Sequence, residues 1–437
     1  MLAILGYLMV VIFLYFIITK RLSPFTGLII VPIIFGLIGG FGLELGPLIM
    51  EGIQKSAPTA ILILFAILYF GIMIDTGMFD PITKRIVKFA KGDPLKVIVG
   101  SALLAGIVGF DGDGTTTIMI CVSAFLPLYK RLGINPTILA MLTVMQIGIT
   151  TLVPWGGPAG RAASVLQLDA TDLYLAMLPG MMVSLIYVLF VAYIIGKRER
   201  ARLGITDLKI VLGAQAEIAS AADPALTEAS DLKRPKLIWI NAILSLAIMV
   251  AIVLEWLPAP VLFIFGTALA LLINYPSLED QRKRIADHSS NALAVTVIIL
   301  AAGIFAGILK GTAMSDAMAQ SLVSLIPESL GAHFPIITAV LSAPVLFFIG
   351  PDAFYFGILP ILTETASSYG ISAMQMGVAS LYGTSFGFIG PLVGAMYLMA
   401  HMTGITLTDI QKHAAKWSVG ILFIYIIVGV ITGTMSL

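Results

Sequence analysis

Two aspartates lie in a segment whose surroundings are apolar enough to be buried in a lipid bilayer. Residues 107–119 read Ile-Val-Gly-Phe-Asp-Gly-Asp-Gly-Thr-Thr-Thr-Ile-Met, and apolar runs flank them on both sides. A carboxylate at membrane depth is costly unless it faces a cavity, a partner or a bound cation. The neighbouring glycines allow an irregular backbone that lines a polar cavity inside the membrane. Asp111 and Asp113 are therefore candidates for binding a cation or a proton.

Asp352 lies in a comparable setting in the second half of the chain. It belongs to the segment Ile-Gly-Pro-Asp-Ala at 349–353, which interrupts another apolar run. Hard divalent cations take oxygen ligands, and magnesium usually keeps oxygens of an anionic substrate together with one or two protein carboxylates. Asp111, Asp113 and Asp352 are therefore the predicted metal or proton sites, and the metal is expected to travel with the substrate.

Arg161 is the candidate for binding the anionic part of such a substrate. It follows an irregular Val-Pro-Trp-Gly-Gly-Pro segment at 153–158, and a guanidinium can hold a carboxylate through two parallel hydrogen bonds. Hydroxyl groups and the N-termini of interrupted helices also favour anions. The other predicted substrate-binding residues are Thr115, Thr116, Thr117, Gly156, Gly157, Tyr355, Thr384, Ser385 and Gly390.

Each of these assignments has a structural alternative. Asp111 or Asp113 can instead cap the helix that begins at the three threonines, because aspartate is a preferred N-cap residue. Arg161 can anchor the chain at the extracellular interface, and Tyr355 can be a packing residue. Asp75, at the end of an apolar run, is either a cytoplasmic boundary residue or a proton or ion site.

The composition indicates a polytopic membrane protein. Hydrophobic residues make up 59% of the 437 residues and charged residues only 11%, which is far more apolar than a globular domain. The net charge is +1, and the basic residues cluster at segment ends, so no nucleic-acid partner is expected. The single cysteine, Cys121, excludes a disulfide within one chain.

Apolar runs divide residues 1–197 into spans and one hairpin. Lys and Arg in short loops tend to stay in the cytoplasm, which places the N-terminus outside. The apolar runs on either side of the two aspartates are shorter than the ~20 residues that a span needs. They predict a re-entrant hairpin over about 97–127 that enters from the cytoplasm. The predicted spans are 2–19, 27–43, 59–75, a broken span 136–166 and 173–196.

The second half, residues 237–437, repeats this order upside down after a polar cytoplasmic linker at 198–236. A hairpin over about 335–362 is predicted to enter from outside, and both termini are predicted to lie outside. The predicted spans are 237–257, 261–273, 292–309, a broken span 371–401 and 417–431. An inverted repeat with paired broken helices is typical of secondary transporters that bind substrate at the bilayer midplane. The predicted fold is therefore an all-α polytopic inverted repeat.

The chain resembles a known family. Its opening Met-Leu-Ala-Ile-Leu-Gly, the Gly-Phe-Asp-Gly-Asp-Gly-Thr-Thr-Thr segment at 109–117 and Gly-Pro-Asp-Ala-Phe at 350–354 are similar to the bacterial metal–citrate:proton symporters (CitMHS), over essentially the full length. The family belongs to the ion transporter superfamily, whose divalent-anion symporters are homodimers with a scaffold domain and an elevator-like transport domain. In those relatives both hairpin tips carry Ser-Asn-Thr, where this chain has aspartates.

The resemblance implies proton-coupled symport of citrate complexed with a divalent metal of the magnesium or calcium class. It also implies a homodimer in the bacterial cytoplasmic membrane, an elevator mechanism and no permanently bound cofactor. The added carboxylates suit a metal-complexed substrate or proton coupling better than sodium coupling. A symporter of free di- or tricarboxylates, driven by protons or sodium, is the alternative.

An enzyme of another class is suggested only by the Asp-x-Asp-Gly-Thr pattern at 111–115, which resembles the first motif of haloacid dehalogenase-type phosphatases. That chemistry needs alternating strands and helices around a parallel sheet, whereas the neighbourhood here is membrane-long apolar sequence. Motifs of metalloproteases, α/β-hydrolases and ATP-driven pumps do not occur in the sequence. The sequence therefore predicts a transporter and not an enzyme.

Overall fold

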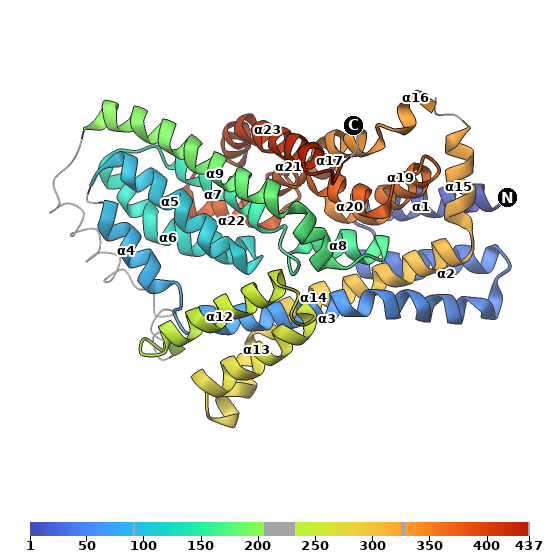
Figure 1. The fold of residues 1–437 in the computed structure, drawn as a ribbon, viewed down its shortest axis with the longest axis horizontal. Coiled ribbons are helices and arrows are strands. Elements are labelled where there is room, and N and C mark those ends of the chain that lie inside the picture. Colours follow the sequence, from blue (N-terminus) through green and yellow to red (C-terminus); the bar gives the residue numbers. More distant parts are fainter. Residues whose placement is uncertain (91, 205–231, 325–327, 436–437) are drawn as a thin grey trace.

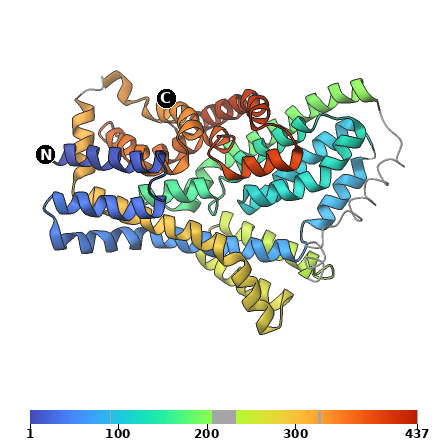
Figure 2. The same ribbon diagram turned by 180° about the vertical axis from the view of Figure 1, so that it is seen from behind.

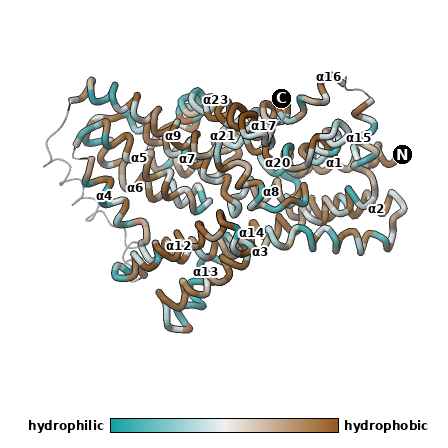
Figure 3. The backbone as a smooth tube through the Cα atoms, viewed as in Figure 1, coloured by the Kyte–Doolittle hydropathy of each residue, from teal (hydrophilic) through white to brown (hydrophobic). Residues whose placement is uncertain are grey.

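A computed structural model describes residues 1–90, 92–204, 232–324 and 328–435 of the chain. Its regular elements in these ranges are all helices, so the predicted all-α class is confirmed. Hydrophobic residues line most of the helices (Figure 3). Most of the predicted linker at 198–236 lies outside the described residues, although its first residues continue a long helix.

Five described stretches are long and apolar enough to cross a bilayer, and the protein is accordingly a multi-pass membrane protein. Four of them are α3 (Leu45–Asp75), α9 (Ala170–Leu203), α14 (Leu278–Gly311) and α23 (Leu407–Ile431), and the fifth is the first hairpin helix. Shorter apolar helices accompany them: α1 (Leu2–Ile18), α2 (Pro24–Ile38), α7 (Pro136–Thr150), α12 (Ile238–Val253), α13 (Ala259–Asn274) and α17 (Phe334–Phe348).

The predicted hairpin in the first half is present. It consists of α5 (Pro94–Val108), a 3-10 turn η2 (Gly109–Asp111) and α6 (Gly114–Leu132), which pack on one another and on α7. Pro94 occupies the first helical turn and Asp93 accepts a cap hydrogen bond, which fixes where α5 begins. Gly112 reverses the chain at φ +82°, a conformation that other residues rarely adopt.

The hairpin in the second half has a different tip. It runs from α17 through α18 (Pro351–Ala353) and a π-helical turn η3 (Phe354–Ile358) into α19 (Leu359–Ser367). The hairpin packs on the helices that follow, α20 (Ala373–Leu381) and α21 (Thr384–Phe388). Because a π-turn widens the helix, it changes which side chains face the neighbouring elements.

Both halves also contain the predicted broken span. In the first half, α7 is separated from α8 (Gly157–Leu166) by an irregular segment. In the second half, the break lies between α21 and α22 (Gly394–Thr403). Helix α7 contacts α21, α6 contacts α22, and η3 contacts α8. The hairpin of each half therefore reaches the broken span of the other half.

Helices α3 and α14 form a long pair that extends across the molecule, with α2, α12 and α13 beside it (Figures 1 and 2). The hairpins, broken spans, α9 and α23 form a second layer against this pair. The short helices α4 (Asp80–Ala90) and α15 (Met314–Val323) hold equivalent places in the two halves, each between a third span and a hairpin. Helix α8 contacts both α3 and α14, and so joins the two layers.

Several helices are longer than predicted. Helix α3 begins at Leu45 and not at residue 59, α14 begins at Leu278 and not at 292, and α23 begins at Leu407 and not at 417. Hydropathy marks only the part of a helix that suits the bilayer. Glutamate, lysine and arginine are good helix formers, so the helices continue through charged residues beyond the apolar runs.

Candidate functional site

A cavity of about 220 Å³ lies between the tips of the two hairpins and the two helix breaks. Small-molecule pockets typically measure ~300–1,000 Å³, so a ligand here is small. Its walls come from both halves of the chain and combine a cation, a carboxylate and several hydroxyls. The lining residues are Gly112, Asp113, Gly114, Thr115, Thr151, Gly157, Pro158, Arg161, Leu346, Pro351, Tyr355, Thr384, Gly387, Phe388, Val393 and Ala395.

Asp113 caps helix α6 and lines the cavity at the same time. Its Oδ1 accepts a hydrogen bond from the Thr115 amide at 3.1 Å. Its Oδ2 accepts from the Thr116 amide at 3.0 Å and from the Thr116 hydroxyl at 2.6 Å. A carboxylate has about four acceptor positions, so these bonds leave room for one more ligand. The capping alternative is therefore correct in geometry and is compatible with ligand binding.

Asp111 does not line the cavity. It is 5% exposed, and its Oδ1 accepts a hydrogen bond from the Asp113 amide at 2.8 Å, which holds the hairpin turn. Its Oδ2 is buried without a hydrogen-bond partner among the described residues. The two aspartates, only two positions apart, thus occupy different environments, because the 3-10 turn and Gly112 direct one inward and the other toward the cavity.

Trp155 links the first helix break to the tip of the first hairpin. Its indole N–H donates to the Phe110 carbonyl at 3.1 Å. The ring also packs against Phe70 and Phe263, with centroid separations of 5.5 and 4.9 Å. These contacts tie the tip to α3 and α13, so the tryptophan is a packing residue here.

Arg161 and Asp352 join the two halves. The Arg161 Nε donates to the Asp352 Oδ1 at 2.7 Å, and the two side chains are 18% and 23% exposed. Arg161 lies on α8 of the first half and lines the cavity, while Asp352 lies on α18 at the tip of the second hairpin, next to the lining residue Pro351. Such a charge-assisted bond is short and directional.

Four of the predicted hydroxyl and glycine residues line the cavity: Thr115, Gly157, Tyr355 and Thr384. The Tyr355 hydroxyl is buried and makes no hydrogen bond within the part of the chain that the structure describes. Tyr355 belongs to the π-helical turn, a kind of irregularity that is frequent at functional sites. The side chain lies beside the cavity, and its neighbour Phe354 packs edge-to-face against the ring.

The remaining predicted residues are close to the cavity but do not line it. The Thr116 hydroxyl donates a hydrogen bond to the Asp113 carboxylate, and the Thr117 hydroxyl donates to the Asp113 backbone carbonyl. Ser385 lies buried where α21 crosses α7. Gly156 and Gly390 approach neighbouring backbone carbonyls closely. These residues shape the first hairpin tip and the two breaks, and they are not among the residues that line the cavity.

Sequence reasoning missed several lining residues. Thr151 follows the last residue of α7, and Phe388, Val393 and Ala395 border the second break. Their positions next to the predicted interruptions were the available signal. Thr151 in particular precedes the Val-Pro-Trp-Gly-Gly-Pro segment by only one residue, and hydroxyl residues at helix ends are natural ligands for polar groups.

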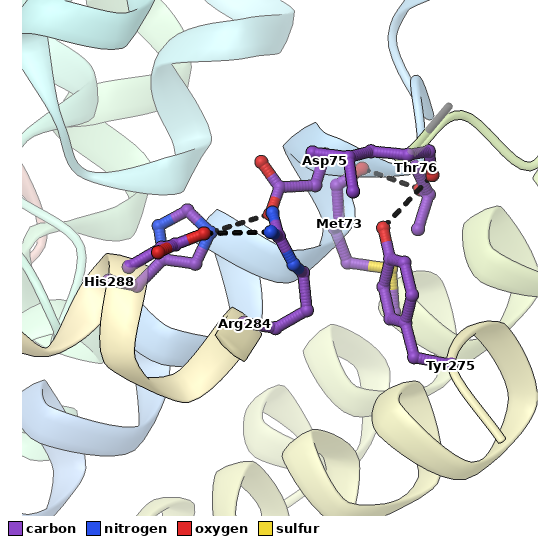
Figure 4. Close-up of polar contacts among 8 residues, drawn as sticks. Met73, Asp75, Thr76, Tyr275, Arg284 and His288 are labelled. Carbon is purple, nitrogen blue, oxygen red and sulfur yellow. Dashed lines mark hydrogen bonds and ion pairs between the residues drawn. The ribbon is translucent and has the colours of Figure 1, made fainter. Parts of the chain in front are cut away.

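A second polar cluster lies between α3 and α14 (Figure 4). The Asp75 Oδ2 accepts from the Arg284 Nη1 at 2.9 Å and contacts the His288 Nε2 at 2.8 Å. The Arg284 Nη2 lies 2.7 Å from the Asp287 carboxylate, and the Arg284 side chain is only 4% exposed. Asp75 is thus an ion-pair partner at the end of its span.

No group of three or more His, Cys, Asp or Glu in the described ranges is placed to hold a metal ion. The aspartates near the cavity therefore do not form an all-protein metal cage there. A metal that binds at this site would draw part of its coordination from its own anion, as magnesium commonly does.

Comparisons with known proteins are consistent with a transport site. Residues 13–383 match the CitMHS family, described as citrate transporter. The chain is 48% identical over 436 residues to a citrate transporter of Bacillus subtilis (strain 168), covering 100% of both chains. It is 46% identical over 438 residues, again with 100% of both chains covered, to the Mg(2+)/citrate complex secondary transporter of the same organism.

A solved structure confirms the architecture at greater distance. The YdaH transporter of Alcanivorax borkumensis, described as having an unusual topology, superposes with a TM-score of 0.58 at 14% identity. The match covers 88% of this chain and 87% of that chain. At this identity the similarity concerns the fold alone.

Proposed function

Because the chain belongs to the CitMHS citrate transporter family, we propose that it is a proton-coupled symporter of citrate complexed with a divalent metal ion. The metal is of the magnesium or calcium class and is carried with the substrate. Members of the family are transporters, so the phosphatase alternative is excluded and the protein is not an enzyme.

The observation that carries the proposal is the pairing of opposite charges around one cavity. Arg161 and Asp113 both line it, together with the hydroxyls of Thr115, Tyr355 and Thr384. A complex of citrate with a divalent cation has a metal side and a carboxylate side, and keeps a net negative charge. Such a dipolar ligand matches a wall with a carboxylate and a wall with a guanidinium.

Asp113 is the proposed metal ligand. Its carboxylate is exposed and rigidly held, and it keeps one acceptor position free. Magnesium usually takes one or two protein carboxylates and completes its shell with substrate oxygens and water. Arg161 and the hydroxyls would then bind citrate carboxylates, while the unpartnered oxygen of Asp111 provides a buried acceptor for a proton.

The two hairpins are the proposed gates. Each hairpin tip reaches the broken span of the other half, so movement of either tip opens the cavity on one side. We further propose an elevator-like movement of the hairpin layer against α3 and α14, in a homodimer of the bacterial cytoplasmic membrane with both termini outside. Cysteine-accessibility labelling of α1 and α23 ends in intact cells tests this orientation.

The alternative is a symporter of free di- or tricarboxylates driven by protons or sodium. The observation that favours this alternative is the guanidinium of Arg161, because it would bind any carboxylate. Uptake of labelled citrate into proteoliposomes distinguishes the metal–citrate symporter from the free-carboxylate symporter. Uptake is measured with excess chelator and with each of the Mg, Ca, Zn and Fe ions. Each measurement is made first under an inward proton gradient and then under a sodium gradient. We expect uptake only with one metal class and only with the proton gradient.

Uptake that survives the chelator would assign free carboxylate as the substrate. Uptake that follows the sodium gradient in place of the proton gradient would overturn the coupling ion. Absence of citrate uptake under every condition would contradict the substrate itself.

A further inference from the structure

Arg161 uses only one edge of its guanidinium for contacts with the residues that the structure describes. Its Nε donates to Asp352, and Nη1 and Nη2 make no hydrogen bond with other residues that the structure describes. A guanidinium carries five N–H donors in one plane. Four of these donors belong to Nη1 and Nη2, and the residue lines the cavity. The larger part of its bonding capacity is therefore available to a ligand.

The position of the guanidinium is also fixed from its other side. The Nη1 atom lies so close to Gly157 that a Cβ at this glycine would come within 2.7 Å of it. The guanidinium is thus folded over the first turn of α8, at the end of the helix that lines the cavity. Asp352 fixes its Nε edge, and the bare Cα of Gly157 gives it the space to lie there.

We propose that Asp352 is a positioning residue for Arg161 and not a metal ligand. Asp352 holds the Nε edge so that the two Nη groups can bind a carboxylate of the substrate bidentately. This role replaces the metal or proton role that the sequence suggested for Asp352. The inference rests on the proposed function, because it assumes that the anionic substrate binds in this cavity.

The arrangement gives the second hairpin a part in substrate binding. A flexible arginine loses rotamer freedom when it binds a ligand, and fixing it in advance removes much of that cost. Here the residue that fixes it belongs to the tip of the second hairpin, whereas Arg161 belongs to the first half. The carboxylate site is therefore complete only when this tip is in place against α8.

A double-mutant cycle tests the inference. The KM for Mg–citrate is measured in proteoliposomes for the wild type, Asp352→Asn, Arg161→Lys and the double variant. If Asp352 acts through Arg161, Asp352→Asn alone raises KM about tenfold relative to the wild type. Added to Arg161→Lys, the same substitution leaves KM unchanged. Equal effects of Asp352→Asn in both backgrounds would overturn the inference.

Metal preference supplies an independent readout. Loss of a positioning residue weakens uptake of every metal–citrate complex that the wild type transports by the same factor, whereas loss of a metal ligand changes the order of preference among the metals. Asp352→Glu keeps the charge and should restore KM to within about threefold of the wild type. Gly157→Ala, which displaces the guanidinium from the other side, should raise KM for all metals in the same way. A changed metal order in Asp352→Asn would make this residue a ligand.

The control variant is Glu51→Gln, which makes the same carboxylate-to-amide change in an exposed ion pair with Lys55 on α3. We expect its KM to equal that of the wild type. All variants are first compared by size-exclusion profile and thermal stability. Failure of wild-type uptake would overturn the proposed function, whereas failure of the inference is seen only in the variants.

Discussion

Two arginine–aspartate ion pairs differ in how completely their hydrogen-bonding groups are used. In the Arg284–Asp75 pair, both Nη groups of the arginine contact carboxylates and Asp75 also contacts His288. In the Arg161–Asp352 pair, Nε is the only guanidinium nitrogen that bonds to a residue in the described ranges, and the guanidinium borders a cavity. Buried polar groups are normally paired. A satisfied pair therefore holds helices together, whereas a half-satisfied pair beside a cavity marks a place for a ligand.

The surroundings of the satisfied pair agree with a structural role. Helices α3 and α14 approach closely at Gly52 and Gly303, where a Cβ on Gly52 would lie 2.1 Å from the Gly303 carbonyl oxygen. Small residues at such a crossing allow tight helix packing in membranes. Asp75 and Arg284 lie at one end of the same helix pair. The ion pair and the close crossing together hold α3 and α14 tightly against each other.

The largest effect is expected at the charged groups that border the cavity. Asp113→Asn keeps a cap acceptor for α6 but removes the charge that we assign to metal binding. Metal-dependent citrate uptake should be abolished. The free energy of unfolding should fall by less than ~1 kcal/mol, because asparagine is also a good N-cap. Initial uptake rates and thermal unfolding measure the two quantities. Full retained transport would contradict the assignment of Asp113.

The next largest effect is expected for Arg161, and it distinguishes this arginine from Arg284. Arg161→Gln removes the charge-assisted bonds to substrate, each worth ~1.5–3 kcal/mol, so kcat/KM for Mg–citrate should fall by about 100-fold or more. The amount of folded protein in the membrane should stay near that of the wild type. An uptake rate within threefold of the wild type would place the anion site elsewhere.

The matching change at the satisfied pair should act on stability. Arg284→Gln leaves Asp75 without its charged partner, and breaking a buried ion pair costs ~3–5 kcal/mol. The free energy of unfolding in detergent should fall by about this amount, while KM of the protein that remains folded is unchanged. A raised KM with normal stability would remove the distinction between the two pairs.

The smallest effect is expected for a group that supports Asp113 from one side. Thr116→Val removes the 2.6 Å hydroxyl bond to the Asp113 carboxylate and keeps the backbone bond. A hydrogen bond to a charged carboxylate is worth ~1.5–3 kcal/mol, but this hydroxyl acts on the ligand only through Asp113, so KM should rise only about fivefold. Titration of uptake against Mg–citrate concentration measures it, with Thr19→Val at an exposed helix end as the control.

The order of the helices was predictable because its signals are local. The length of an apolar run and its interruption by proline and glycine are visible in a short window of sequence. The broken span predicted at 136–166 begins where α7 begins and ends where α8 ends. Helix ends beyond the bilayer were predicted less well, since charged residues continue a helix that hydropathy no longer marks. The cap formed by Asp113 was also predictable from its neighbours.

Contacts across the chain were not predictable in the same way. Arg161 and Asp352 are 191 positions apart, and the sequence assigned them to opposite ends of the substrate. Only the packing of α8 against the second hairpin brings them together. The different environments of Asp111 and Asp113 depend on one glycine turn, whose direction a pattern of residue types does not give.

The ion pair between the halves also bears on how the protein is made. Synthesis produces Arg161 long before Asp352, and an arginine inside a bilayer without a partner is costly. We therefore expect helix α8 to reach its final place only after the second hairpin has been synthesised and inserted. The bond that we propose to prepare the carboxylate site would then also make maturation of the first half depend on completion of the chain.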